Sequence, residues 1–226
     1  MPRKPIIRSD NLPYHVSGRS NNKEWFYLEM PEVWDIFSEK LLLVSMEYGA
    51  QVIAFVLMHN HYHLLLTTPR ANLDRIMNYL MREVSRSIGK KSGRINHVFG
   101  GRYYWSLIDN ALYFSHAYRY VYRNPVEAGI CRSVGEFAFS TYKYLGNIDS
   151  PPFPLHDYRH RYFCTIPHHL GQRGLWLNQN YEDGEADLIR RALRKPVMRF
   201  RTSRREHAVT IPLILSTGLC QKERGT

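Results

Sequence analysis

One short stretch, residues 55–66, limits what this chain can fold into more than any other. It reads Phe-Val-Leu-Met-His-Asn-His-Tyr-His-Leu-Leu-Leu, so three histidines at alternate positions lie between two apolar runs. Alternation is the period of a β-strand, which predicts that His61 and His63 project from one face, joined by His59 if the strand is unbroken there. The apolar flanks predict a buried strand that holds its imidazoles rigidly.

Two imidazoles that project together from a rigid strand form half of a site for a divalent metal. A solvent-facing side of the strand is the simpler explanation, and it suits one histidine better than three within five residues. We therefore predict a metal or phosphate site at this strand. A zinc hydrolase built on His59, His61 and His63 is an alternative that the spacing leaves open.

Length and charge narrow the class of protein further. A chain of 226 residues suits one domain with an extension, or two small domains. Lys and Arg number 31 against 20 Asp and Glu, and this formal charge of +11 favours a polyanionic partner, most often nucleic acid. Three widely separated cysteines with no CxxC pair fit a reducing cytoplasm, and no apolar stretch has the length of a signal peptide or membrane span.

The hydrophobic periodicity predicts an alternation of strands and helices with two hairpin-like steps. Strands are expected at 12–20, 50–57, 59–66 and 102–108, and helices at 31–48, 71–88 and 111–123. This order favours an α+β fold of the ferredoxin-like kind, an antiparallel sheet with helices on one face and the histidine pair on a central strand. A Pro-rich stretch at 150–154 predicts a boundary between a domain at 1–149 and a basic C-terminal extension at 150–226, with a short helix near 186–195.

The helix expected at 111–123 carries a second set of polar residues. Tyr113, His116, Tyr120 and Asn124 are spaced by three, four and four, so they share one face. Tyrosine can act as a covalent nucleophile when a divalent metal polarises the phosphoryl group that it attacks. The alternative is that Tyr120 is one of sixteen tyrosines and is simply buried.

Basic residues gather on and after the helix expected at 71–88, and a solvated helix face explains such a run as well as a phosphate-binding track does. The candidates for DNA contact are Arg82, Arg86, Lys90, Lys91, Arg94 and Arg102. A second basic run with no acidic residue follows near the C-terminus, at Arg190, Arg191, Arg194, Lys195, Arg199, Arg201, Arg204 and Arg205.

Four segments carry a family resemblance, in order and with family-like spacing over about residues 12–145. They are MHNHYHLLL at 58–66, YVYRNPVEAG at 120–129, YHVSGRSNN at 14–22 and HVFGGR at 97–102. Together they resemble the REP-associated tyrosine transposases, single-tyrosine members of the HUH single-strand endonuclease superfamily. His59 departs from the family, which often has Pro or Asp there, and could be an added ligand, a phosphate contact or a turn residue.

The resemblance implies a chemistry and a set of roles. His61, His63 and Asn124 would hold Mg²⁺ or Mn²⁺, with His59 and His116 as candidates for supporting contacts. Tyr120 would attack a single-stranded DNA phosphate, become linked to the 5′-phosphate and release a 3′-hydroxyl. The substrate would be a hairpin formed by a repeated extragenic palindrome (REP) element.

The resemblance also implies a bacterial, cytoplasmic, nucleoid-associated protein, a monomer or homodimer with no membrane partner. The alternative in another class is a domesticated DNA- or RNA-binding protein that keeps the fold without cleaving. The presence of all four of His61, His63, Tyr120 and Asn124 argues against that alternative, because a binding protein does not need the complete set.

Overall fold

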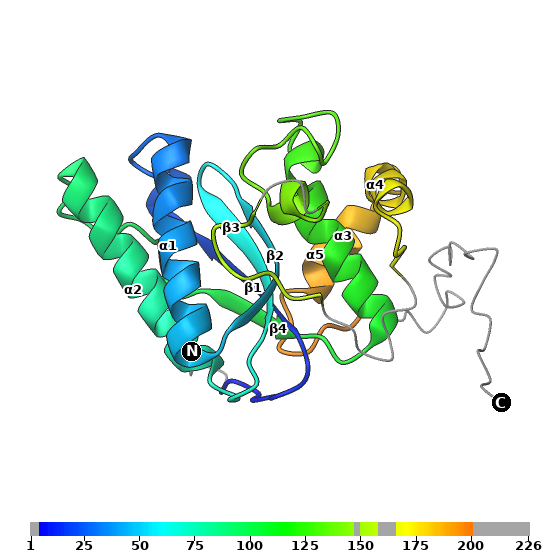
Figure 1. Ribbon diagram of the computed structural model, residues 1–226, viewed down its shortest axis with the longest axis horizontal. Helices are drawn as coiled ribbons and strands as arrows, with labels where there is room; N and C mark the ends of the chain where they lie inside the picture. Colours follow the sequence, from blue (N-terminus) through cyan, green and yellow to red (C-terminus); the bar gives the residue numbers. More distant parts are fainter. Residues whose placement is uncertain (1–4, 147–149, 158–165, 201–226) are drawn as a thin grey trace.

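A four-stranded antiparallel sheet lies at the centre of the molecule (Figure 1). The computed structural model describes residues 5–146, 150–157 and 166–200. The strands are β1 (Tyr14–Arg19), β2 (Gln51–Leu57), β3 (His61–Thr67) and β4 (Tyr104–Leu107), and the α-helices are α1 (Met30–Tyr48), α2 (Leu73–Ser92), α3 (Ala111–Glu127), α4 (Leu170–Asn178) and α5 (Glu185–Ala192). The spatial order is β2-β3-β1-β4, so the α+β class, the antiparallel sheet and an inner position for the histidine strand are confirmed.

The ends of α1 and the start of α3 coincide with local sequence signals. Pro31 lies in the first turn of α1, and Gly49 ends that helix in the left-handed conformation, with a φ of 72°. The side chain of Asn110 caps α3 by accepting a hydrogen bond from the amide of Leu112 at 2.8 Å. These caps fix where α1 and α3 begin and end, and therefore which of their residues face the sheet.

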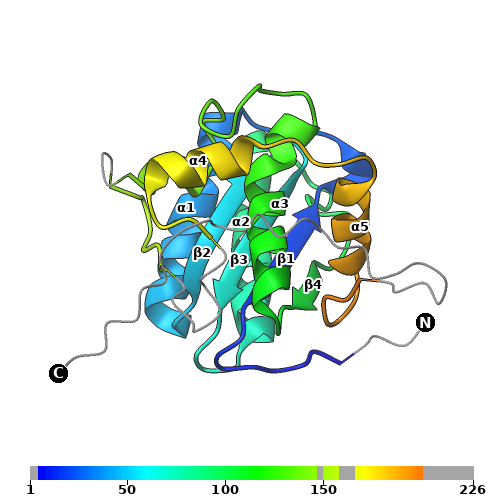
Figure 2. The ribbon, with the colours of Figure 1, turned by 90° about the vertical axis from the view of Figure 1, so that its right-hand side faces the viewer.

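The prediction that the helices lie on one face of the sheet is wrong. Helices α1 and α2 pack together on one face, while α3 covers the other face with α4 and α5 beside it (Figures 1 and 2). The physical reason is in the strands: six of the seven residues are buried in both β2 and β3. A strand that is apolar on both sides must be covered on both sides.

The third helix is also longer than expected, because it continues through Pro125 to Glu127. Proline lacks an amide hydrogen and therefore removes one hydrogen bond from a helix. Pro125 lies in the last turn, where the loss is limited, and the amide of Ala128 still donates to the carbonyl of Asn124 at 3.0 Å. The expected short helix near the C-terminus is present as α5.

The described part of the chain after residue 150 packs against the sheet. Phe153 is 2% exposed within the core under α1, and the amide of His156 donates to the Val52 carbonyl at 2.7 Å. Beside β4, the amide of Leu107 donates to the Pro196 carbonyl and the amide of Met198 donates to the Leu107 carbonyl, each at 2.9 Å. A domain boundary at 149–150 stays a prediction, and Arg201, Arg204 and Arg205 lie outside the described residues. Among the described residues, no helix has the length and apolarity needed to cross a membrane.

Candidate active site and nucleic-acid interface

The predicted nucleophile and the histidine pair meet on the α3 face of the sheet. The ring centroids of His61 and His63 are 5.1 Å apart, with the ring planes at 87°. The Tyr120 ring centroid lies 5.3 Å from that of His63. The three groups therefore converge within one chain, although more than fifty residues separate the histidines from the tyrosine.

A third histidine, which the sequence did not single out, completes this cluster. His15 on β1 is 4% exposed, and its Nε2 lies 2.9 Å from Nδ1 of His63. The pairing of β1 with β3 explains why His15 lies next to His63. Ser17 is directly opposite His63, and His15, two residues before Ser17, projects from the same face of the sheet. The alternation within YHVSGR shows that His15, Ser17 and Arg19 share a face, but only the pairing of β1 with β3 shows which face it is.

Burial keeps these imidazoles uncharged. It lowers the pKa of His15 to about 3 and that of His61 to about 4, where Arg19 contributes as well. The pKa of His63 lies well below its ordinary value, first because the ring is buried and then because His61 and His15 are close. At neutral pH all three rings are therefore in the form that binds metal ions.

The donor atoms left over at the histidine pair fit a divalent cation. Nδ1 of His61 lies 2.7 Å from Oδ1 of Asn60, and Nδ1 of His63 is taken by His15, so Nε2 remains on both rings. Outer partners of this kind orient metal-binding histidines in proteins. The amide nitrogen of Asn124 donates to the Tyr120 carbonyl at 2.7 Å, which leaves its side-chain oxygen as the donor that a hard cation prefers.

The other predicted supporting histidines lie elsewhere. The His59 ring packs against Trp25, with centroids 4.7 Å apart. Within residues 5–146, 150–157 and 166–200, no three side chains of the His, Cys, Asp and Glu types form a group that could hold a metal ion. The zinc site built on His59, His61 and His63 is therefore not supported. His116 faces α5, with Nδ1 3.9 Å from Oε1 of Glu185, and burial lowers its pKa to about 4.

Helix α5 adds a charged group that the sequence did not place. A hydrogen bond between the side chains of Arg190 and Tyr120 raises the pKa of the Arg190 guanidinium. Arg190 also pairs with Asp187 at 2.6 Å on its own helix. Tyr120 is only 7% exposed, and its side chain contacts both His63 of the sheet and Arg190 of the C-terminal part of the chain.

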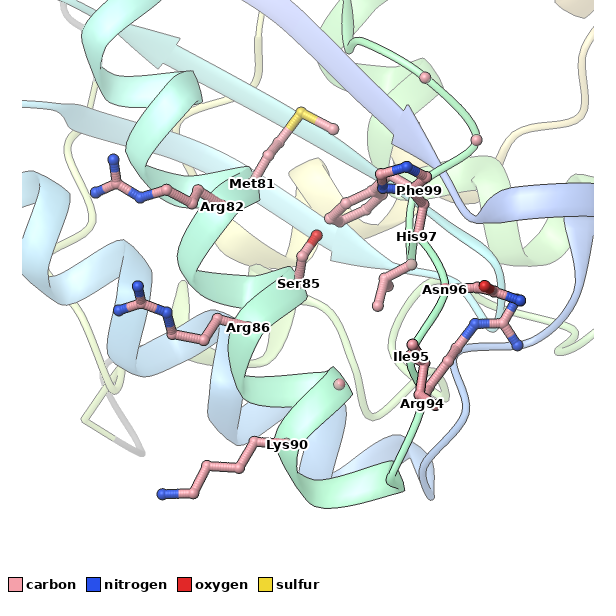
Figure 3. A pocket seen from close by; sticks show the side chains of 14 residues that line it. Met81, Arg82, Ser85, Arg86, Lys90, Arg94, Ile95, Asn96, His97 and Phe99 are labelled. Carbon is pink, nitrogen blue, oxygen red and sulfur yellow. The ribbon is translucent and has the colours of Figure 1, made fainter.

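A basic groove lies on the other side of the sheet, between α2 and the segment 94–101 (Figure 3). Its volume is about 690 Å³, which is within the usual range for ligand sites. Arg82, Arg86 and Lys90 extend together from the side of α2 that faces away from segment 94–101, and Arg94 lies on that segment. Lys91 is 3.8 Å from Glu32 of α1, and Arg102 lies over the Tyr103 ring beside a neighbouring hollow.

The site consists of a tyrosine held against a histidine pair on the antiparallel sheet of an α+β fold. Comparisons with known proteins identify the family to which such a chain belongs. The model of the IS200-like transposases matches residues 9–124, about half of the chain, and ends at Asn124. This chain belongs to the IS200-like transposase family. Membership gives it a transposase-like, DNA-processing and DNA-cleaving role, in a family that generally uses a divalent metal.

Solved structures agree on the fold. A REP-associated tyrosine transposase bound to a REP hairpin matches with a TM-score of 0.57 and 16% identity, over 71% of this chain and 94% of that one. A structure from Deinococcus radiodurans R1 described as a candidate transposase covers 46% of this chain and 82% of its own, at 17% identity, but its TM-score of 0.35 carries no argument. No curated protein sequence matches the chain.

Proposed function

We propose that this protein cuts and rejoins single-stranded DNA at hairpin-forming repeated extragenic palindromes, through a covalent bond to Tyr120. The observation that carries the proposal is the 5.3 Å separation between the rings of Tyr120 and His63 in one chain. The Tyr120 ring packs in the apolar cluster of this face and also lies against the neutral histidine pair. A phenol in this position suits an attack on a phosphate held at the histidines.

The proposed reaction exchanges one phosphodiester bond for another. The Tyr120 oxygen attacks the phosphorus and gives up its proton, the bond from phosphorus to the 3′-oxygen breaks, and that oxygen leaves as a hydroxyl after taking up a proton. The protein is then joined to the 5′-phosphate. Because the new ester conserves the bond energy, a 3′-hydroxyl can reverse the step and join strands without a nucleotide cofactor.

His61, His63 and Asn124 would hold Mg²⁺ or Mn²⁺ in this proposal. A bound cation supplies stabilisation of the charge that develops on the phosphoryl oxygens. The uncharged donor set predicts weak binding of the ion until a phosphate contributes its own charge. His15 and Asn60 would keep the two imidazoles in the required orientation through their contacts with the Nδ1 atoms.

The basic groove is the proposed contact for the hairpin backbone. Arg82, Arg86 and Lys90 recur every four residues and would follow a phosphate track along α2. The solved neighbour of similar fold is bound to a REP hairpin, which supports a hairpin as the substrate class. Lys91, Arg94 and Arg102 are further candidates for DNA contact, and the protein would act as a monomer or homodimer in the bacterial cytoplasm, at the nucleoid.

A covalent adduct tests the catalytic proposal directly. The protein is incubated with hairpin-bearing single strands and Mn²⁺ and then run on a denaturing gel. We expect an adduct with the native chain and none with Tyr120→Phe or with EDTA. Tyr122→Phe is the matched control, because Tyr122 lies on the same helix but bonds to Thr141, so its adduct should persist.

Two outcomes would contradict the proposal. An adduct that survives Tyr120→Phe would move the nucleophile elsewhere. Tight hairpin binding without any adduct under these conditions would favour the non-cleaving binding protein of the same fold.

Salt dependence tests the groove separately. If Arg86 and Lys90 contact phosphates, each change to Ala should reduce the slope of log affinity against log salt by roughly 0.7–0.9. Arg132→Ala, which removes an exposed cation from the loop after α3, serves as the comparison. An unchanged slope in both groove variants would remove α2 from the interface.

A further inference from the structure

The most exposed tryptophan of the described residues lies beside the histidine strand. Trp25 is 70% exposed, whereas Trp34 is 7% exposed. Its indole packs against the His59 ring in a tilted arrangement, with centroids 4.7 Å apart and planes at 32°. Large aromatic side chains normally bury most of their area, so an indole supported on one side and open on the other is a candidate platform for a planar ligand.

The platform is fixed to the same turn that carries the first histidine of the pair. The amide of Phe26 donates to the His59 carbonyl at 2.8 Å, and Phe26 itself is 2% exposed in the core. Asn60 donates to the Lys23 carbonyl at 2.7 Å with its amide nitrogen and lies 2.7 Å from Nδ1 of His61 with its oxygen. Trp25 and His61 are therefore held by one short hydrogen-bonded unit.

The same unit also adjoins the basic groove. The amide of Gly100, which lines the groove, donates to the Arg19 carbonyl at 3.0 Å. Arg94, also in the groove, lies 3.5 Å from the carboxylate of Glu24, the residue next to Trp25. Short hydrogen-bonded segments therefore connect the turn that carries Trp25 both to the groove and to the histidine pair.

The surroundings of the indole select the ligand class. The residues that precede the indole, Asn-Lys-Glu at 22–24, are exposed and polar, so this stretch of the surface is not an apolar patch of the kind that binds proteins. A nucleobase needs only one flat aromatic face, with a cation nearby for its phosphate. Lys23 supplies such a cation.

We propose that Trp25, supported by His59, is the stacking site for one unpaired base of the single-stranded DNA that leads from the hairpin to the cleaved phosphate. The proposal rests on the proposed function and names a subsite of it. It also gives His59 a role, because its ring supports the indole and does not bind the metal.

Binding measurements in the Tyr120→Phe background test this without cleavage. Hairpins with and without a short unpaired flank are compared by fluorescence anisotropy, with 2-aminopurine placed at each flank position in turn. We expect quenching at one position. Trp25→Ala should abolish that quenching and weaken binding of the flanked hairpin roughly tenfold, while binding of the trimmed hairpin is unchanged.

Two further variants separate stacking from simple apolar contact. Trp25→Phe keeps a flat ring and should retain most of the affinity, whereas Trp25→Leu should behave like Trp25→Ala. Leu175→Ala changes an equally exposed apolar residue on α4 and should have no effect.

The proposal is overturned if Trp25→Ala binds both hairpins like the parent, or if no flank position is quenched. Its failure is distinguishable from failure of the catalytic proposal. If quenching depends on Trp25 although the native chain never forms a covalent adduct, the stacking proposal is supported and only the cleavage proposal is contradicted.

Discussion

The two faces of the sheet are built on opposite principles. The α1–α2 face encloses a continuous aromatic and aliphatic core, in which Phe37, Phe55 and Tyr62 pack ring against ring. The α3 face has apolar contacts too, but it also buries His15, His63 and His116, together with the cations Arg119 and Arg123. Burying polar groups costs free energy unless they are paired, so the first face supplies stability and the second holds the site.

The polar groups of the α3 face are only partly satisfied. Arg123 bonds to Glu127 at 2.6 Å and to the Leu177 carbonyl at 3.1 Å, and Arg119 bonds to the carbonyl of Asn180 at 3.1 Å. Within the described part of the chain, Nε2 of His116 and the hydroxyl of Ser106 have no hydrogen-bond partner. Unpartnered buried hydroxyls also occur on the described part of the α1–α2 face, at Ser38 and Tyr62, so the two faces differ in their buried histidines and cations and not in the presence of unpaired groups.

The largest expected contrast comes from a core variant. Phe37→Ala should lower the free energy of unfolding by about 3–5 kcal/mol, because it removes a fully buried ring of the α1–α2 face. DNA cleavage per folded molecule should stay close to that of the native chain. Urea denaturation and a single-turnover assay measure the two quantities, and Phe37→Leu is the milder variant if the first does not fold. A large loss of cleavage per folded molecule would show that the two faces of the sheet do not contribute independently to stability and activity.

The converse change is His61→Ala on the other face. We expect cleavage to fall at least 100-fold and Mn²⁺ affinity to fall with it, because one of the proposed ligands is lost. Stability should change by less than about 1 kcal/mol, since His61 is only half-buried. Electron paramagnetic resonance of Mn²⁺ gives the affinity independently of activity. Undiminished metal binding in this variant would exclude His61 as a ligand.

A smaller effect is expected from His15→Leu, which removes the contact with Nδ1 of His63. Outer-shell partners of metal-binding histidines typically contribute 10–100-fold to affinity, so Mn²⁺ binding should weaken within that range. The tautomer of His63, read from ¹⁵N chemical shifts, should become mixed. If His15→Leu changes only the stability, while the His63 tautomer and the Mn²⁺ affinity stay the same, then His15 contributes to packing and not to metal binding.

The effect that depends least on any single residue is the slope of stability with pH. The folded pKa values of His15, His61 and His116 lie at about 3, about 4 and about 4, below the ordinary 6.5 of an unfolded chain. The unfolded state therefore binds more protons as pH falls, and stability should decrease from pH 6.5 towards 5, by up to about 1.4 kcal/mol per pH unit for each group. Urea denaturation across this range measures the slope, and His116→Gln should reduce it. A flat profile would mean that these rings are accessible to protons in the folded state.

Much of this architecture was within reach of the sequence, because local rules govern it. The alternation of His61 and His63 predicted one face of one strand, and the spacing of Tyr120 and Asn124 predicted one face of one helix. The caps at Gly49 and Asn110 follow from the same short-range chemistry. The predicted end of α3 was wrong because tertiary packing overrides local preference there. The helix continues through Pro125 to Glu127.

The sequence by itself determined most of the elements, α4 excepted, together with the class of fold and the types of chemical group that the chain carries, since periodicity and residue type are properties of neighbours along the chain. Only the tertiary structure decided that α3 covers the second face, that His15 meets His63, that Arg190 reaches Tyr120 and that Trp25 rests on His59. Each of these contacts depends on strand register or on the docking of distant segments. Such contacts depend on how the whole chain packs, and a short stretch of sequence does not specify that packing.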